Sequence, residues 1–184
     1  MIFIKTILIL CILALFNNRQ VINYEYLDSQ IDISITNFIY EHNEYEKSFY
    51  YKGEHVNDIS RKLNKYLKGS LNNKGEYITK KCISVGLDPY LATAVMLQET
   101  GCYWGCSKLV RTCNNVAGNK GTPRCNGGSY RKFDSINDGI NFAIKKLNSY
   151  YKKGYKTPKQ INPFYAEDNT WYKKVDNYVK KLKK

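Results

Sequence analysis

The stretch that decides the fold is Asp88–Gly101, DPYLATAVMLQETG. Asp88 followed by Pro89 is typical of a helix start, because the aspartate accepts from free backbone N–H groups and proline is tolerated at the first helical position. The residues that follow are apolar almost all round, which predicts a helix that is buried on most sides. Gly101, just beyond them, is typical of a helix end.

One carboxylate, Glu99, lies in the last turn of this predicted helix. The negative end of the helix macrodipole and the apolar neighbours both disfavour the ionised form, so we expect a raised pKa for Glu99. A carboxylic acid that stays protonated near neutral pH is what a general acid needs to protonate a glycosidic oxygen. Position alone favours a plainer interpretation, a solvated residue at a helix end, but motifs further along the chain favour catalysis.

The size and charge of the chain limit what it can be. Its 184 residues are enough for one domain with a sizeable core and a short leader. The formal net charge is +13, from 29 Lys and Arg against 16 Asp and Glu. Such a balance favours an anionic partner, which could be nucleic acid, a membrane surface or the acidic polymers of a cell wall. Lysines on solvated helix faces account for part of this charge.

The first 20 residues look like a targeting segment. Lys5 precedes an apolar run from Thr6 to Phe16, which is too short for a convincing membrane-spanning helix and is followed by no small-residue cleavage site. A cleaved signal peptide and an uncleaved N-terminal membrane anchor therefore both stay open. In either case we expect the rest of the chain to be secreted or held at the outer face of the membrane, where nucleic acid is not the expected partner.

Four cysteines gather in one short region of this chain. In an oxidising compartment such a cluster indicates two disulfides, in one of three connectivities. A structural zinc site is disfavoured because paired CxxC spacings are missing, and we expect neither a metal nor a cofactor. Cys82 stands apart on the apolar side of a predicted helix and is expected to be a buried thiol. The clustered cysteines are Cys102, Cys106, Cys113 and Cys125.

The chain divides into three predicted parts. Residues 1–20 form the signal peptide or anchor, residues 21–54 a stalk of uncertain structure, and residues 55–184 a single domain. In that domain, helical spacing and cap signals predict helices that begin near Val56, Gly75, Asp88, Ser135, Thr157 and Thr170.

Two local features refine this prediction. Ser135 with Asp138 resembles a capping box, and Pro163 is expected to interrupt the short helix that begins at Thr157. The region from Cys102 to Phe133 is rich in Gly, Asn and Cys and is expected to be a loop that the disulfides hold together. The sequence thus predicts a mainly α fold with a disulfide-braced loop lobe, in which there is room for a small β element.

Four motifs in a fixed order resemble a known family, the lysozyme-like peptidoglycan glycosidases, and most closely the flagellar-type and phage N-acetylglucosaminidases. The likeness covers roughly Val56 to Leu182. It implies a lysozyme-like helical domain that cuts the glycan strands of peptidoglycan. The motifs are LATAVMLQETGC at Leu91–Cys102, CNNVAG at Cys113–Gly118, SYRKFDSINDGI at Ser129–Ile140 and YAEDNTWYKKV at Tyr165–Val175.

The resemblance also implies roles for single residues. Glu99 matches the catalytic general acid of the family. Tyr165 matches a catalytic tyrosine that lines the site and polarises the substrate or a water. Asn114, Asn115 and Gly118 match the turn that faces the cleft. In that turn the present chain has alanine at position 117, where the family more often has glycine.

Aromatic residues near Glu99 are candidates for binding sugar rings. Tyr103 and Trp104 follow the predicted acid in a loop and are expected to stack on a sugar face. Trp171 is expected to lie in the core instead.

A second catalytic carboxylate is missing from the stretch after Glu99, since the next acidic residue is Asp134. Glu76 and Asp88, upstream, stay open as tertiary neighbours. Paired carboxylates must lie at a defined distance across the bond, so their absence favours assistance by the 2-acetamido group of the substrate. N-acetylglucosaminidase, muramidase and lytic transglycosylase action all fit this chemistry. From a different class, a non-catalytic module that binds the anionic cell wall or another polyanion also fits, and we expect a monomer in each case.

Overall fold

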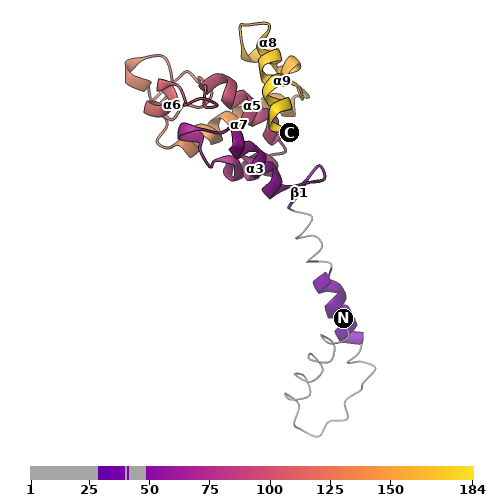
Figure 1. The fold of residues 1–184 in the computed structure, drawn as a ribbon. Coiled ribbons are helices and arrows are strands. Elements are labelled where there is room, and N and C mark those ends of the chain that lie inside the picture. Colours follow the sequence, from indigo (N-terminus) through magenta and orange to yellow (C-terminus); the bar gives the residue numbers. More distant parts are fainter. Residues whose placement is uncertain (1–28, 40, 42–48) are drawn as a thin grey trace. The chain divides into compact units, whose positions relative to one another are not determined.

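The computed structural model describes residues 29–39, 41 and 49–184 (Figure 1). The predicted leader at residues 1–20 and much of the predicted stalk lie outside these residues. The chain divides into two compact units, Met1–Lys47 and Ser48–Lys184. In the first unit, residues 29–39 and 41 are helical.

Across the described residues, no helix combines the length and apolar character needed to cross a membrane.

The second unit opens with a β-hairpin. Strand β1 (Tyr50–Tyr51) pairs antiparallel with β2 (Glu54–His55), in a register that places Tyr50 opposite His55. The His55 side chain then accepts a hydrogen bond from the backbone N–H of Asn57 and caps the first helix of the unit. The unit therefore includes residues 48–54, which the sequence pattern places in the stalk.

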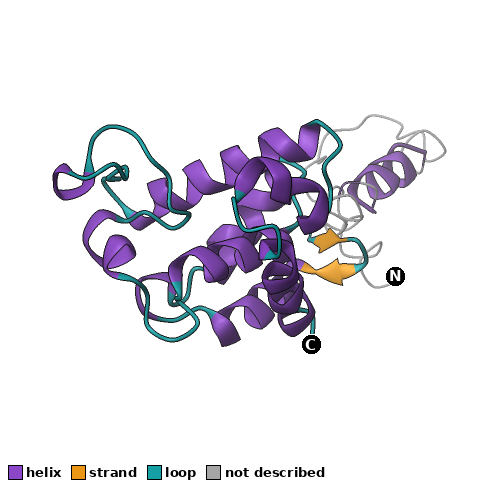
Figure 2. Ribbon diagram, turned by 90° about the horizontal axis from the view of Figure 1, so that it is seen from above, coloured by secondary structure: helices purple, strands orange, loops and turns teal. Residues whose placement is uncertain are grey.

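Helices make up most of this unit, so the mainly α, lysozyme-like fold is confirmed (Figure 2). Its helices are α3 (Val56–Tyr66), α4 (Gly75–Ser84), α5 (Pro89–Thr100), α6 (Lys108–Cys113), α7 (Ile136–Lys152), α8 (Pro158–Tyr165) and α9 (Trp171–Leu182), with short 3₁₀ turns at Gly69–Leu71 and Cys125–Gly127. All of these helices except α6 start where caps and periodicity predict them.

Helix α5 is the centre of the core. Ten of its 12 residues are buried, and α3, α4, α7 and α9 all pack against it. The Asp88 carboxylate accepts from the backbone N–H groups of Tyr90 and Leu91, as an N-cap should. Gly101 ends the helix in the left-handed conformation, at φ 62°, which glycine adopts without strain. The apolar sequence of α5 thus fixes the place of Glu99 at its last turn.

The lobe between α5 and α7 departs from the prediction in one respect. The region 102–133 contains a helix, α6, whereas the sequence pattern predicts only loop. The helix forms because Val110 and Cys113 are buried against the rest of the domain, which a short segment without a repeating period does not reveal. Two isolated β-bridges, Lys120 to Tyr130 and Arg124 to Arg131, are the small β element of the lobe.

The cysteine predictions are confirmed, and the structure selects one connectivity. Cys102 pairs with Cys106, and Cys113 pairs with Cys125. Cys82 is a fully buried free thiol. Burial raises the pKa of this thiol, which keeps it protonated and unreactive.

The predicted break at Pro163 is wrong, because α8 runs through it. Proline removes one helical hydrogen bond and crowds the carbonyl four residues before it, but it does not forbid the helix. A capping box between Thr157 and Gln160 starts the helix, and Ala166 N–H still donates to Asn162 O, 3.1 Å away, beyond the proline. A short helix with strong end signals therefore tolerates the proline.

Helix α7 holds the lobe in place at Gly139. The predicted capping box is confirmed: Ser135 accepts from Asp138 N–H while the Asp138 carboxylate accepts from Ser135 N–H. One residue later, a Cβ added to Gly139 would lie 1.9 Å from the carbonyl oxygen of Asn114, the residue that ends α6. Only glycine allows this close approach of α7 to the lobe.

We therefore expect Gly139→Ala to lower the free energy of unfolding by about 1–3 kcal/mol or more, the usual cost of overpacking. Urea unfolding followed by circular dichroism measures the change. Gly105→Ala is the matched control, since no atom lies within 4 Å of a Cβ built at Gly105. Equal midpoints for the two variants would contradict the proposed contact.

Candidate active site

Glu99 lies in the last turn of α5 and is partly buried. Its Oε1 accepts a hydrogen bond from Trp171 Nε1, 2.8 Å away, at the start of α9. Its Oε2 faces the turn that follows α6, where a Cβ added to Gly118 would lie 3.5 Å from this oxygen. One carboxylate oxygen is therefore held by the core while the other is directed toward the lobe.

The surroundings of Glu99 raise its pKa above the usual value. Burial is the largest cause, because it disfavours the charged form. The Trp171 hydrogen bond and the positive charge of Lys146 act in the opposite direction, because both favour the carboxylate. Burial prevails, so Glu99 holds its proton to a higher pH than a solvated glutamate does.

Two hollows border Glu99. One, of about 530 Å³, is lined by Glu99 itself together with Trp104 and Arg111. The other, of about 680 Å³, is lined by Gly118, Lys146 and Tyr165, among others, and all three lie close enough to Glu99 to touch it or to interact with its charge. Glu99 therefore lines the first hollow directly and neighbours residues that line the second.

Tyr165, at the end of α8, forms the wall between Glu99 and the second hollow. Its ring stacks on that of Trp171, with centroids 4.9 Å apart, and Lys146 Nζ lies 4.6 Å from the ring centre. Burial, with the negative charge of Glu99 as a smaller cause, raises the pKa of the Tyr165 hydroxyl. This hydroxyl is buried and has no hydrogen-bond partner among the described residues, so it keeps a proton to donate.

The two predicted stacking residues differ in their surroundings. Trp104 is 83% exposed and lines the first hollow beside Glu99. Tyr103 packs instead against Tyr66 and Tyr178, with ring centroids 5.8 and 6.2 Å away, and meets the edge of Trp104 at 4.5 Å. Trp104 therefore has a free face for a sugar ring, and Tyr103 supports it from behind.

The predicted turn of Asn114, Asn115 and Gly118 brings only Gly118 against Glu99. Asn115 is buried, and its Nδ2 donates to the carbonyl oxygens of Asn119 and Arg131, each 2.8 Å away. Asn114 ends α6 in the left-handed conformation, and its Nδ2 donates to Phe133 O. Both asparagines thus shape the turn that carries Gly118, and their amides are occupied in doing so.

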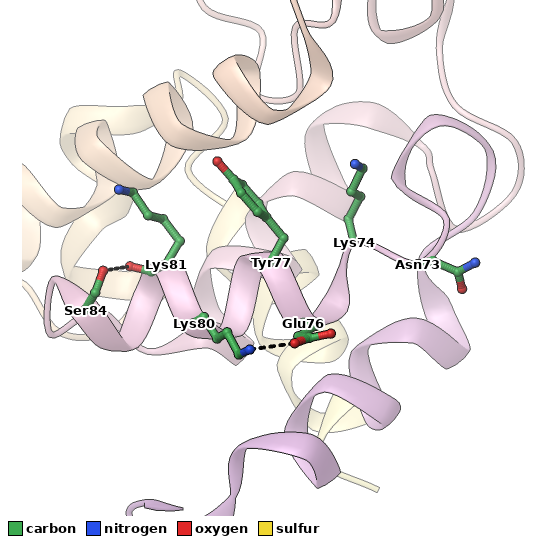
Figure 3. Close-up of a pocket in the computed structure, with 7 residues that line it drawn as sticks. All are labelled: Asn73, Lys74, Glu76, Tyr77, Lys80, Lys81 and Ser84. Carbon is green, nitrogen blue, oxygen red and sulfur yellow. Dashed lines mark hydrogen bonds and ion pairs between the residues drawn. The ribbon is translucent and has the colours of Figure 1, made fainter. Parts of the chain in front are cut away.

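Neither upstream carboxylate reaches the site. Glu76 is exposed and pairs with Lys80, 2.6 Å away, in a separate hollow on α4 (Figure 3). Asp88 caps the opposite end of α5, about 16 Å along the helix from Glu99 at 1.5 Å per residue. Among the described residues that line the two hollows, Glu99 is the one acidic side chain.

The described part of the chain likewise brings together no group of three or more His, Cys, Asp or Glu side chains that could hold a metal ion.

The sequence does not predict the contacts that two residues, Trp171 and Lys146, make with Glu99. Trp171 is buried as expected, but its hydrogen bond to Glu99 joins residues 72 positions apart, and no local pattern reveals such a contact. Lys146 belongs to a lysine pair on α7 that looks like any solvated pair. The order of the motifs, with the tryptophan six residues after Tyr165, was the one available signal for Trp171.

We expect Trp171→Phe to raise the pKa of Glu99 further, because the substitution removes a hydrogen bond that favours the charged form. A ¹³C NMR titration of labelled glutamate carboxyl groups measures this pKa directly. Trp104→Phe is the matched control, since Trp104 makes no recorded hydrogen bond to Glu99, and it should leave the titration unchanged. A lower pKa for Glu99 in Trp171→Phe would contradict the assigned direction.

Comparison with known proteins agrees with this geometry. No curated protein matches the chain closely enough to identify a relative. The family model Glucosaminidase, described as mannosyl-glycoprotein endo-beta-N-acetylglucosaminidase, matches residues 75–184, which is more than half of the chain and includes every residue of both hollows. The chain therefore belongs to the glucosaminidase family and is a glycosidase that acts on peptidoglycan.

Proposed function

We propose that the protein is an N-acetylglucosaminidase that cleaves peptidoglycan strands with Glu99 as general acid. The proposal rests on two properties of Glu99. It is the one acidic side chain among the described residues that line the two hollows, and burial raises its pKa. A general acid must hold its proton at the working pH and lie where the substrate passes. The raised pKa of Glu99 and its place in the lining of the first hollow support this role.

The first step is proton transfer from Glu99 to the glycosidic oxygen. As the bond between C1 and this oxygen breaks, its electron pair stays on the oxygen, which takes the proton and leaves as a hydroxyl group. No second carboxylate among the described residues of the hollows can attack C1 or stabilise the positive charge there. The carbonyl oxygen of the 2-acetamido group of the substrate attacks C1 instead, in the known exception to the paired-carboxylate scheme.

The cyclic intermediate is then opened by water, and Glu99, now a carboxylate, takes the proton from that water. The Trp171 hydrogen bond supports this second role, because it stabilises the charged form. The Tyr165 hydroxyl, buried and without a partner, donates to the acetamido group or to the water. Attack by a hydroxyl group of the sugar itself in place of water would give the anhydro product of a lytic transglycosylase.

The remaining predicted residues have binding roles in this proposal. Trp104 stacks on a sugar ring in the first hollow, with Tyr103 behind it. Gly118 leaves room for the sugar next to Glu99 Oε2, because a side chain here would fill that space. Asn114 and Asn115 hold the turn in place.

Export completes the proposal. The two disulfides favour an oxidising compartment, which agrees with the leader pattern at residues 1–20. A net charge of +13 suits a monomer that works on the anionic surface of a cell wall.

We expect Glu99→Gln to abolish cleavage, with a loss of at least about 100-fold, because glutamine has no proton to give. Purified peptidoglycan is digested, reduced with borohydride and examined by mass spectrometry. Reduced N-acetylglucosamine ends indicate the proposed bond, reduced muramic acid ends a muramidase, and anhydro ends a transglycosylase. Glu76→Gln is the matched control and should keep full activity. Full activity of Glu99→Gln would refute the assignment of the acid.

The pH dependence follows from the raised pKa. The acid is competent only while protonated, so the rate should fall as the pH rises through the pKa of Glu99, above the usual glutamate value of about 4.3. The folded state also binds this proton more tightly than the unfolded state does. The free energy of unfolding should therefore fall over the same interval, from the unfolded to the folded pKa.

Glu99→Gln should remove this part of the pH dependence of stability, measured as Tm against pH. If the Tm of both proteins falls in parallel over that interval, burial of Glu99 is not its cause.

A further inference from the structure

The second hollow carries a strong and unbalanced charge. We call it the lysine hollow, after Lys120, Lys145 and Lys146, which line it together with Asn119 and Tyr165. No lining residue is acidic. Its volume of about 680 Å³ is within the range of ligand pockets, about 300–1,000 Å³.

Two of these lysines are free to meet a ligand. Lys120 and Lys145 are exposed, and neither forms an ion pair with a described residue. Lys146 is partly buried and interacts with Glu99, so the negative charge of Glu99 already balances part of the Lys146 charge. Arg131 adds positive charge nearby, since its guanidinium group lies 5.0 Å from the ring centre of Phe142, another residue of the lining.

Two buried donors at the same hollow have no acceptor among the described residues. They are Asn119 Nδ2 and the Tyr165 hydroxyl. The orientation of the Asn119 amide follows from Lys146, whose Nζ lies 3.4 Å from Asn119 Oδ1. A buried donor without an acceptor costs free energy. A bound group that only accepts hydrogen bonds would satisfy Asn119 Nδ2, while the Tyr165 hydroxyl serves the proposed reaction.

We propose that the lysine hollow binds a carboxylate carried by a muramic acid residue next to the cleaved bond. Ammonium groups, an unpaired donor and the lack of acidic side chains all match an anionic acceptor better than they match neutral sugar hydroxyls. The hollow borders Glu99 through Gly118, so the carboxylate belongs to the sugar adjoining the cleavage point. This inference rests on the proposed cleavage by Glu99.

Peptidoglycan offers two sources of such a carboxylate. In strands that keep their stem peptides, the lactyl group of muramic acid is amidated and the free carboxylates belong to the peptide. In strands stripped by an amidase, the lactyl carboxylate itself is free. Chitin oligosaccharides, built only of N-acetylglucosamine, have neither.

The test compares the three substrates with the double variant Lys120→Gln/Lys145→Gln. We expect its kcat/KM to fall about tenfold on carboxylate-bearing strands, the loss of one or two charge-assisted hydrogen bonds, while cleavage of chitin oligosaccharides stays unchanged. A loss on intact strands alone identifies the stem peptide as the source, and a loss on stripped strands alone identifies the lactyl group. A loss on both indicates that either carboxylate is accepted.

The matched control is Lys74→Gln/Lys81→Gln, which removes the same charge from the hollow on α4 (Figure 3). We expect its kcat/KM to stay within about twofold of the parent on every substrate, because solvated charges away from the two hollows contribute little. An equal loss in both double variants, or an equal loss on all three substrates, overturns the proposal. If the parent protein cleaves no glycan at all, it is the proposed general acid that fails, and binding of stripped strands to the two double variants then tests the lysine hollow by itself. Equal binding by both overturns it.

Discussion

The hydrogen bond between Trp171 Nε1 and Glu99 Oε1 is the contact on which the site depends. It joins the end of α5 to the start of α9, and these two helices pack closely along the core. The bond directs the second oxygen of Glu99 toward the lobe and opposes the effect of burial on its pKa. Because the bond favours the carboxylate, Glu99 holds its proton less tightly than burial alone would make it do.

Two elements of the lobe hold the other side of the site. The close contact of Gly139 with Asn114 fixes α7 against the end of α6, and the buried amide of Asn115 closes the turn that follows. Gly118 in this turn is thereby placed beside Glu99 without a side chain between them. The disulfide between Cys113 and Cys125 limits the freedom of the same segment in the unfolded chain.

Local signals account for what the sequence predicts well. The Asp88 cap and Gly101 mark the two ends of α5, and the clustering of four of the six cysteines indicates two disulfides. Contacts that depend on tertiary packing could not be predicted from the sequence. Helix α6 forms because Val110 is buried by distant residues, and the bond from Trp171 to Glu99 spans 72 positions. Nothing within a window of one helix encodes either feature, although the order of the motifs does point to the site.

Lys146 lines the proposed carboxylate site and interacts with Glu99, the proposed general acid, so its charge couples the two. Its positive charge lowers the pKa of Glu99, while its own pKa is lowered by burial and raised by Glu99. A carboxylate bound in the lysine hollow offsets part of that positive charge and weakens its effect on Glu99. The pKa of Glu99 then rises, and the acid is more fully protonated when the substrate is present than when it is absent. If both proposals hold, the binding of the substrate carboxylate itself helps to keep Glu99 protonated.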